Sequence, residues 1–448
     1  MIRHLLPLFL LNFSALSAEP LKIVTIGDSL TDGYGEVAEI ANVPYLSTVV
    51  GPSIYPQPDA PSENPRSYNW PELLSIFRSD QASFGIEDSW LDLRVAGFQR
   101  NFAIVGTTTL NWYYLFESEF WDFGSSDDDF PAASAYYLTK SSLLEEIETA
   151  DVVVIFLGGN DLKNDYNDLF NAEDPSIYLD PIFDRLVYLH HAVRAAHASI
   201  PIVVATVPDI GATPQIYQTY NVPLQQEQTR ASIAALNEEI FTSFEAESNT
   251  AVARVDHLTD LVFDLSPFHL NGTVFTVEGD PYNPPDHLFT KDNFHPNTAA
   301  QGLIANEIIT AINSLVSEDR AITPFSYRDI LRSLLQLDPD QPYVDWAANF
   351  SLPSDSFEAD SDGDGLGNGV EMLLGSSPLV ADRPLSGTWS PNAAIHWTPQ
   401  ESAERYLLWE LEESSDLLQW APVAEDRLTD NDGTFTASPL DNPQSFVR

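Results

Sequence analysis

The sequence predicts an α/β fold in which a parallel sheet is covered by helices on both faces. Between residues 19 and 318, short and nearly continuous apolar runs alternate with segments whose apolar residues recur at helical spacing. Strands buried on both faces show such runs, because neither face meets water. This alternation is typical of a doubly wound domain, whose reactive groups lie on loops at the carboxyl ends of the strands.

The expected elements follow one another in the order that this fold requires. The expected strands are Leu21–Ile26, Asn101–Val105, Val152–Leu157, Ile202–Val207 and Ala251–Val255. Helical spacing of apolar residues marks three segments: Ile182–Ala196, Ile233–Phe244 and Leu303–Ile312. Helices in these places can carry the chain back between parallel neighbours.

The composition excludes several classes of protein. Hydrophobic residues make up 44% of the 448 residues, which excludes an intrinsically disordered chain. The formal net charge of −47 excludes recognition of nucleic acid through its phosphates and disfavours anionic membranes. The sequence has no cysteine, so disulfides, thiolate zinc sites and a cysteine nucleophile are excluded.

Residues 1–18 match a secretory signal peptide. A basic start is followed by the apolar stretch Leu5–Leu11 and by small residues near Ser17 and Ala18, where we expect cleavage. That stretch is too short to span a bilayer, and no other segment is long and apolar enough to do so. We therefore expect a secreted protein, extracellular or periplasmic, without a transmembrane segment.

A serine stands directly after the first expected strand, in Gly27-Asp28-Ser29-Leu30. A sharp turn there would present the hydroxyl, and glycine would allow close approach of the backbone. Position 31 is threonine, so the Gly-x-Ser-x-Gly elbow of the α/β-hydrolase fold is absent. Taken alone, the pattern is equally typical of a helix-capping serine.

A matching base and carboxylate stand before the last expected helix, in Asp292-Asn293-Phe294-His295. A serine hydroxyl needs a neutral imidazole to accept its proton, and the imidazole needs a carboxylate to fix its tautomer. An aspartate three residues before the histidine can fold back onto one ring nitrogen. Taken alone, this spacing also suits a surface turn.

Two further elements could stabilise an oxyanion. Gly158-Gly159-Asn160-Asp161 follows a strand, so Asn160 can aim its amide at the developing charge. Gly106 ends another expected strand, and its backbone N–H is a second candidate donor. Both could instead be ordinary strand-to-loop turns.

The four blocks, in this order, resemble those of the SGNH (GDSL-type) hydrolases. The resemblance covers about 300 residues and implies a flavodoxin-like three-layer α/β/α sandwich over 19–318. It implies that Ser29 is the nucleophile, His295 the base and Asp292 its orienting carboxylate. It also implies an oxyanion hole formed by Ser29, Gly106 and Asn160, and no cofactor for catalysis.

The substrate is less well defined than the chemistry. Compared with small family members, the chain carries a long insert at 34–100. It also has an aromatic segment at 111–123, whose side chains could stack on sugars, line an acyl pocket or pack as a lid. We expect a secreted serine esterase for short acyl, especially acetyl, esters, including esters of polysaccharides. The alternatives are a lipase or phospholipase of the same family, and a calcium-stabilised glycan-binding or adhesion protein with an inactive hydrolase domain.

Residues 359–383 contain a candidate calcium loop. Oxygen donors fall at positions 1, 3, 5, 9 and 12 of a twelve-residue pattern, and glycine occupies position 6. The expected ligands are Asp360, Asp362, Asp364, the carbonyl of Leu366, Asn368 and Glu371. The loop resembles those of dockerins and thrombospondin type 3 repeats, which implies a structural Ca²⁺; an acidic solvated linker is the alternative.

Two further segments complete the chain. Residues 319–358 read as a linker with a short helical piece at Tyr327–Leu337. Residues 384–448 read as a small β-rich module, in which Tyr406, Trp409 and Trp420 lie among acidic residues. The sequence is compatible with three roles for this module: glycan binding, attachment to a cell surface and sorting.

Overall fold

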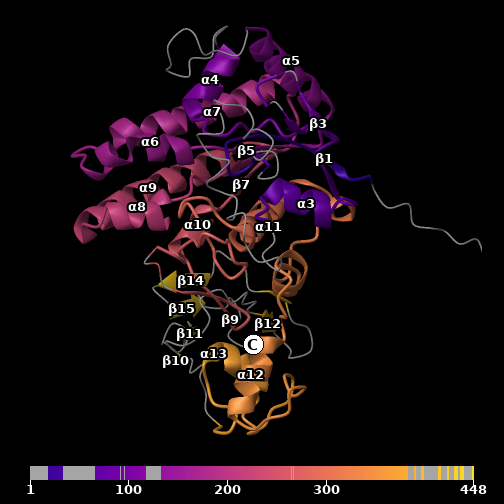
Figure 1. Cartoon of the computed structure of the whole chain (residues 1–448), viewed down its shortest axis with the longest axis vertical. Helices are drawn as coiled ribbons and strands as arrows, with labels where there is room; N and C mark the ends of the chain where they lie inside the picture. The colour runs from indigo at the N-terminus through magenta and orange to yellow at the C-terminus, as the bar shows by residue number, and fades with distance from the viewer. Residues whose placement is uncertain are drawn as a thin grey trace, which may run out of the picture.

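A five-stranded parallel sheet forms the centre of the computed structural model (Figure 1). The structure describes residues 19–33, 66–117 and 133–381, except 91, 95, 264 and 266, together with short strands between 388 and 447. Every neighbouring pair of strands is parallel. Their order across the sheet is β2 (Ala82–Ser83), β1 (Leu21–Gly27), β5 (Val152–Phe156), β6 (Ile202–Ala205) and β7 (Thr250–Ala253). This is the flavodoxin-like order, so the predicted fold class is confirmed.

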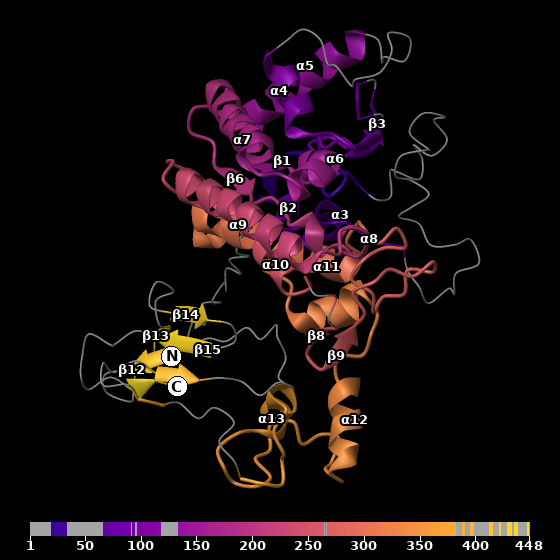
Figure 2. The ribbon, with the colours of Figure 1, turned by 90° about the vertical axis from the view of Figure 1, so that its left-hand side faces the viewer.

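Both faces of the sheet are buried, as the continuous apolar runs predict. Along β5, Val152 and Val154 contribute to one hydrophobic cluster, whereas Val153 and Ile155 contribute to a second cluster on the opposite face. Successive side chains of a strand point to opposite faces, so each strand supplies both clusters. The sheet is therefore the middle of three layers (Figures 1 and 2).

Helices cover each face. On the first face lie α3 (Trp70–Phe77), α11 (Thr298–Leu315) and the π-helix η4 (Asp329–Leu334). On the second lie α4 (Thr109–Glu117), α5 (Ala133–Thr149), α6 (Gly159–Phe170), α7 (Ser176–Ala196) and α9 (Pro223–Glu245). The remaining elements of the sheet domain are β3 (Glu87–Ser89), β4 (Ala96–Phe98), η2 (Ile210–Ala212), α8 (Pro214–Thr219), α10 (Asp256–Asp260), β8 (Phe268–Leu270), β9 (Thr273–Phe275) and η3 (Glu318–Arg320).

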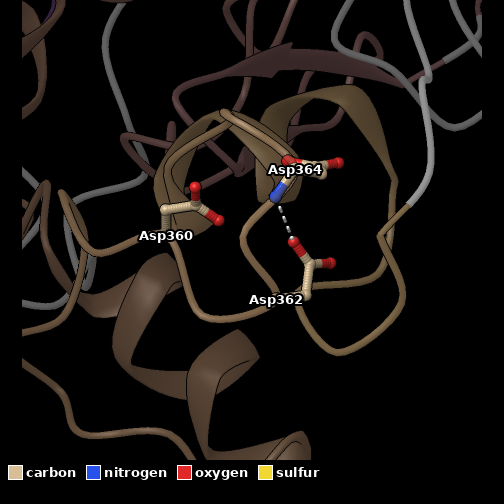
Figure 3. A group of neighbouring side chains, drawn as sticks. All are labelled: Asp360, Asp362 and Asp364. Atoms are coloured by element: carbon tan, nitrogen blue, oxygen red, sulfur yellow. Dashed lines mark hydrogen bonds between the residues drawn. The ribbon is translucent and has the colours of Figure 1, made fainter.

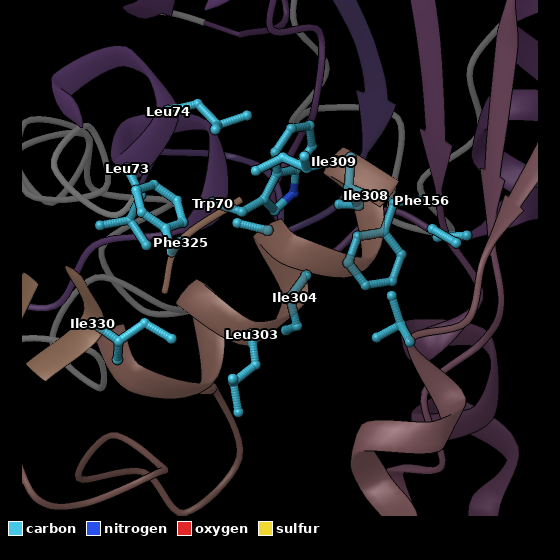
Figure 4. Close-up of a cluster of buried hydrophobic side chains, with 14 of the residues drawn as sticks. Trp70, Leu73, Leu74, Phe156, Leu303, Ile304, Ile308, Ile309, Phe325 and Ile330 are labelled. Atoms are coloured by element: carbon cyan, nitrogen blue, oxygen red, sulfur yellow. The ribbon is translucent and has the colours of Figure 1, made fainter. Parts of the chain in front are cut away.

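The packing of α11 against α3 closes the first face (Figure 4). Trp70 is fully buried, and its ring meets that of Phe84 edge to face with centroids 5.6 Å apart. Ile304, Ile308 and Ile309 of α11 lie in the same cluster. Complete burial of side chains of this size contributes about 1.5–3 kcal/mol each, so α11 is firmly anchored. This matters because the loop before α11 carries His295.

One predicted strand needs correction. Residues 101–105 run beside the carboxyl half of β1, but only Asn101 forms a bridge, with Thr25. Phe102 N donates to Thr25 O over 3.0 Å and Ile104 N donates to Gly27 O over 3.1 Å. The segment thus lies on the same side of β1 as β2 and continues that edge of the sheet towards the carboxyl end of β1. It does not form a regular strand.

The connector after the sheet domain contains more helix than the sequence indicates. The expected helical piece Tyr327–Leu337 is present as the shorter π-helix η4. Helix α12 (Gln341–Asn349) was not predicted, and α13 (Asn368–Leu374) begins inside the acidic loop. Both helices lie beyond the β8–β9 hairpin, far from α4 and α5 (Figures 1 and 2).

After residue 381, the described residues are short antiparallel strands. They are β10 (Thr388–Trp389), β11 (Ile395–Trp397), β12 (Glu412–Ser414), β13 (Ala421–Pro422), β14 (Leu428–Asn431), β15 (Thr434–Ala437) and β16 (Phe446–Val447). Tyr406, Trp409 and Trp420 lie outside the described residues, as does the predicted signal peptide at 1–18. Among the described helices, none combines the length and hydrophobicity needed to cross a membrane.

Asn101 ties the edge segment to β1 and to the turn after it, which yields a prediction. Its Oδ1 accepts from Thr25 Oγ1 over 2.5 Å, and its Nδ2 donates to Thr31 O over 2.7 Å. Asn101→Ala should lower the free energy of unfolding by about 2–3 kcal/mol, because it leaves buried polar groups unpaired. Urea denaturation of this variant and of the exposed control Asn167→Ala measures the effect. Equal losses in the two variants would contradict it.

Candidate active site

Ser29 lies on a tight turn at the carboxyl end of β1. The carbonyl of Asp28 accepts from Thr31 N and Asp32 N, and its Oδ1 accepts from Leu30 N over 2.9 Å. A Cβ on Gly27 would lie 2.8 Å from Thr31 Cβ, so only glycine lets the turn fold back this closely. The turn therefore fixes the position of Ser29, which is 4% exposed.

The loop before α11 presents His295 to this turn. Asp292 Oδ1 accepts from the backbone N–H groups of Phe294 and His295 and from Thr290 Oγ1, each over 2.9 Å. Asn293 has a φ of 61°, a conformation that asparagine tolerates better than most residues. The carboxylate therefore shapes the loop that holds the histidine.

Ser29, His295 and Asp292 form a continuous hydrogen-bonded chain. The distance from Ser29 Oγ to His295 Nε2 is 2.9 Å, and that from His295 Nδ1 to Asp292 Oδ2 is 2.6 Å. Burial opposes ionisation of Asp292, but the imidazole and the surrounding N–H groups outweigh it and hold its pKa well below the usual range. An ionised carboxylate facing Nδ1 leaves Nε2 as the acceptor for the serine proton.

Asn160 lies at the same edge of the sheet, at the start of α6. Gly158, which precedes it, has a φ of 113°, and a Cβ there would come within 2.6 Å of Val207. Asn160 Nδ2 donates to Thr107 O over 3.0 Å and approaches Asp28 Oδ2 at 3.4 Å. The structure thus places the amide beside the serine turn, and its role towards an oxyanion stays a prediction.

Gly106 lies in the turn that follows the edge segment. It is exposed and has a φ of 76°. The flanking residues are fastened to the end of β1, since Ile104 N and Thr107 Oγ1 both donate to Gly27 O, over 3.1 and 3.2 Å. Gly106 therefore belongs to the rim of the site, and its N–H remains a predicted oxyanion donor.

Two polar residues of the site, Asp28 and Asp161, were missed by sequence reasoning. Asp161 is buried and accepts from the N–H of Thr109 over 2.8 Å and from its Oγ1 over 2.6 Å, which connects the third block to α4. Burial also raises the pKa of Asp28 to about 7. The sequence shows both aspartates inside the motifs, but not that they are buried.

The described part of the aromatic segment, residues 111–117, packs inside the domain. Trp112 is fully buried, and its Nε1 donates to Thr107 Oγ1 over 3.1 Å. Tyr113 packs against Tyr188 of α7 with ring centroids 4.6 Å apart. Residues 111–117 form most of α4, and these contacts pack the helix against the domain, while residues 118–123 lie outside the described part of the chain.

A cavity of about 90 Å³ adjoins Ser29 and Asn160. It extends from the serine turn between the loops after β6 and β7 and helix α11. Its wall is almost entirely apolar and includes Leu258, Phe294, Leu303 and Ile304. An apolar space beside a serine hydroxyl is suited to the hydrocarbon part of a ligand.

The acidic loop lies apart from this cavity and brings three aspartates together (Figure 3). One side-chain oxygen each from Asp360, Asp362 and Asp364 lies within 4.8 Å of the others. Asp362 Oδ1 accepts from Asp364 N over 3.2 Å, and Asp364 Oδ1 accepts from Leu366 N over 2.8 Å. Asp362 Oδ2, Asp364 Oδ2 and Asn368 Oδ1 are buried without a hydrogen-bond partner. Hard oxygens left unsatisfied in this way fit a divalent cation such as Ca²⁺.

The last two expected ligands lie at the start of α13. Asn368 and Glu371 are both fully buried. No helix directly precedes the loop, because the described residues 350–359 are not helical. The loop therefore lacks a helix directly before it, which an EF-hand would have.

Comparison with known proteins gives one strong match. Residues 23–308, more than half of the chain, match the model of a family described as GDSL-like Lipase/Acylhydrolase. A sequence search among curated proteins finds no relative.

Solved structures give weaker likenesses. A family 3 carbohydrate esterase from Clostridium thermocellum is 15% identical, with 66% of this chain and 98% of that chain covered and a TM-score of 0.31. A family 3 carbohydrate esterase from Talaromyces cellulolyticus is 16% identical, with 66% and 100% covered and a TM-score of 0.31. An acetylxylan esterase from Geobacillus stearothermophilus is 15% identical, with 66% and 97% covered and a TM-score of 0.31. At these scores, the substrates of those enzymes say nothing about the substrate of this chain.

The buried Asp28 predicts a pH dependence of stability. Because its folded-state pKa of about 7 lies above the ordinary value of 3.8, the folded protein retains a proton that the unfolded chain releases as the pH rises through this window. Stability should therefore fall between about pH 4 and pH 7, on the order of 4 kcal/mol from this group. Asp28→Asn should flatten the fall.

Chemical denaturation at several pH values measures this effect. Asp165→Asn, on the exposed side of α6, is the matched control and should keep the wild-type slope. A wild-type slope in Asp28→Asn would refute the assignment of the proton to Asp28.

Proposed function

The chain belongs to the GDSL-like lipase/acylhydrolase family and is an ester-bond hydrolase, and we propose that it cleaves short-acyl esters through an acyl-enzyme on Ser29. The observation that carries this proposal is the hydrogen-bonded chain from Ser29 through His295 to Asp292. A nucleophile, a base and an orienting carboxylate at these distances form the constellation used in acyl transfer.

The first step requires transfer of one proton. His295 Nε2 accepts the proton of Ser29 as its Oγ attacks the ester carbonyl, and the same nitrogen then protonates the departing alcohol. Asp292 keeps the proton of the neutral ring on Nδ1 of His295 and stabilises the imidazolium when it forms. Hydrolysis of the acyl-enzyme repeats the sequence, with water as the nucleophile and Ser29 as the leaving group.

The negative oxygen of each tetrahedral intermediate needs hydrogen-bond donors. We propose the N–H groups of Ser29 and Gly106 and the amide of Asn160. The contact of Asn160 with Asp28 measures 3.4 Å, longer than its 3.0 Å bond to Thr107 O. We expect the amide to exchange this weaker contact for the oxyanion, because a hydrogen bond to a charged acceptor is stronger.

The cavity supports a short acyl group. A cavity of about 150 Å³ holds the six carbons of benzene, so 90 Å³ has room for about four carbons. This volume favours a short-chain esterase over a long-chain lipase. The signal-peptide pattern at 1–18 supports export, which would bring the enzyme to acylated polysaccharides outside the cell.

We also propose that the acidic loop binds Ca²⁺ in a structural role. Asp360, Asp362, Asp364, the Leu366 carbonyl, Asn368 and Glu371 would hold the ion. The three buried oxygens without partners support this assignment, since each costs free energy until a cation or donor reaches it. Bound Ca²⁺ would fix the loop between α12 and α13.

Replacement of the nucleophile tests the hydrolytic proposal. Ser29→Ala should lower kcat/KM for p-nitrophenyl butyrate by at least about 10⁴-fold, and Asp292→Asn should lower it by about 10³- to 10⁴-fold. The exposed Ser199→Ala is the control and should leave it unchanged. Mass spectrometry after treatment with diethyl p-nitrophenyl phosphate should place a single adduct on Ser29. Modification of another residue, with activity retained in Ser29→Ala, would overturn the mechanism.

Removal of calcium tests the second proposal. Titration calorimetry of the metal-free protein should show binding of one Ca²⁺, and the ion should raise the Tm of the segment that contains α12 and α13. Asp362→Ala should abolish binding, while Asp355→Ala, an exposed aspartate just before the loop, should not. Ester hydrolysis should persist in both variants, because the loop lies apart from Ser29. Equal binding by the two variants would exclude this site.

A further inference from the structure

A lysine lies on the same helical face as Asn160, the proposed oxyanion donor. Lys163 follows Asn160 by three positions in α6, and residues three apart in a helix are neighbours on one face. The side chain of Lys163 is exposed. The chain has 20 lysines and arginines together against 67 aspartates and glutamates, so a cation beside the site is a distinctive feature.

The ammonium of Lys163 lies one aromatic ring away from the proposed base. Its Nζ is 3.9 Å from the centroid of the Phe294 ring. That ring meets the imidazole of His295 edge to face, with centroids 5.2 Å apart, and it forms part of the wall of the cavity beside Ser29. Because Lys163 is exposed while Phe294 lines the cavity, the ammonium lies at the mouth of the cavity.

The ammonium has no counter-ion in contact with it. Among the described residues, Lys163 forms no ion pair. Contact with the ring lowers the pKa of Lys163 by desolvation, while the carboxyls of Asp292 and Asp28 attract the charge from a greater distance. A lysine ammonium carries three N–H donors, which an exposed side chain can offer to a ligand.

The proposed chemistry decides which part of an ester meets Lys163. The acyl group occupies the apolar cavity, and the alcohol oxygen must reach His295 Nε2 to receive its proton. The alcohol part therefore stays at the mouth, where Lys163 lies. A lysine ammonium is a compact point charge, and its hydrogen bonds to carboxylates are stronger than those between neutral groups.

Local charges decide whether an anion can bind at this mouth. The net charge of −47 is spread over the whole chain, and charges farther away than about 8–10 Å are largely screened at ordinary ionic strength. Near the site, the ionised Asp292 disfavours a second anion, whereas Lys163 attracts one. An anionic ester should therefore depend on Lys163 more strongly than a neutral ester does.

From these observations we propose that Lys163 binds a carboxylate on the alcohol part of the ester, so that the enzyme prefers esters of acidic alcohols to their neutral analogues. This inference rests on the proposed function and adds the chemical class of the alcohol part. Lys163 determines specificity in this scheme and takes no part in proton transfer. An acylated polysaccharide meets the requirement where the esterified sugar carries a carboxylate.

The test compares two acetate esters of nearly equal size, 4-acetoxybenzoate and 4-acetoxybenzamide. Both present the same acetyl group to the cavity, and only the first is negatively charged at neutral pH. Lys163→Met should lower the ratio of their kcat/KM values, anionic over neutral, by about fivefold relative to wild type. Lys163→Arg should keep most of the ratio, because the charge remains. Lys22→Met, at the opposite end of β1 from Ser29, is the control and should keep the wild-type ratio.

The ratio separates recognition of the substrate from a structural role. Loss of packing on Phe294, or a change in the electrostatics of His295, would alter the hydrolysis of both esters by the same factor and leave the ratio unchanged. Comparison between variants also cancels the intrinsic difference in reactivity of the two esters. Salt gives a second readout: higher ionic strength should lower the ratio in the wild-type enzyme and should not lower it in Lys163→Met.

Two results would overturn the inference. One is an equal ratio in wild type and Lys163→Met while hydrolysis of both esters depends on Ser29. The other is a Lys22→Met variant that lowers the ratio as much as Lys163→Met, which would assign the effect to net charge alone. A failure of the proposed function would appear instead as hydrolysis that survives in Ser29→Ala, so the two failures are distinguishable.

Discussion

The carboxylate of Asp292 is the group on which the geometry of the site depends. One of its oxygens accepts three hydrogen bonds from its own loop, and the other accepts from the imidazole of His295. The same charge therefore folds the loop, orients the ring and selects its tautomer. No separate element is needed to aim the base at Ser29, because the loop conformation and the ring orientation share one support.

The rest of the site contains more carboxyl groups than this chemistry needs. Asp28, Asp161 and Asp209 are buried at the carboxyl edge of the sheet, and burial raises the pKa of each. Backbone N–H groups of Leu30, Thr109 and Gly211 satisfy part of each carboxylate. The loops after the strands are thus held in shape by short side chains that reach back to nearby backbone, with Asp161 additionally tied to Thr109 Oγ1. Departures from a simple apolar core concentrate at functional sites, as this arrangement illustrates.

Sequence reasoning was most successful where local pattern and global fold agree. The strands β1, β5, β6 and β7 are continuous apolar runs, and each lies within three residues of its predicted bounds. The order of motifs at strand ends also predicted that Ser29 and His295 would meet. The prediction of a strand at 101–105 was wrong because pairing of this segment depends on neighbours far away in the chain. Helix α12 was not predicted because it lies in a stretch rich in proline and aspartate, which are uncommon in helices. Burial of Asp28, Asp161 and Asp209 follows from tertiary packing, which a single sequence does not show.

The separation of Ser29 and His295 along the chain has a consequence for biogenesis. The two residues are 266 positions apart, and both must be in place before the Ser29 hydroxyl meets the imidazole of His295. In the proposed mechanism, an incomplete nascent chain therefore has no working nucleophile until α11 has docked on the sheet. Because pairings between distant segments form slowly, the appearance of hydrolytic activity reports the end of folding rather than its beginning. On the same proposal, the protein stays inert towards esters during its own synthesis.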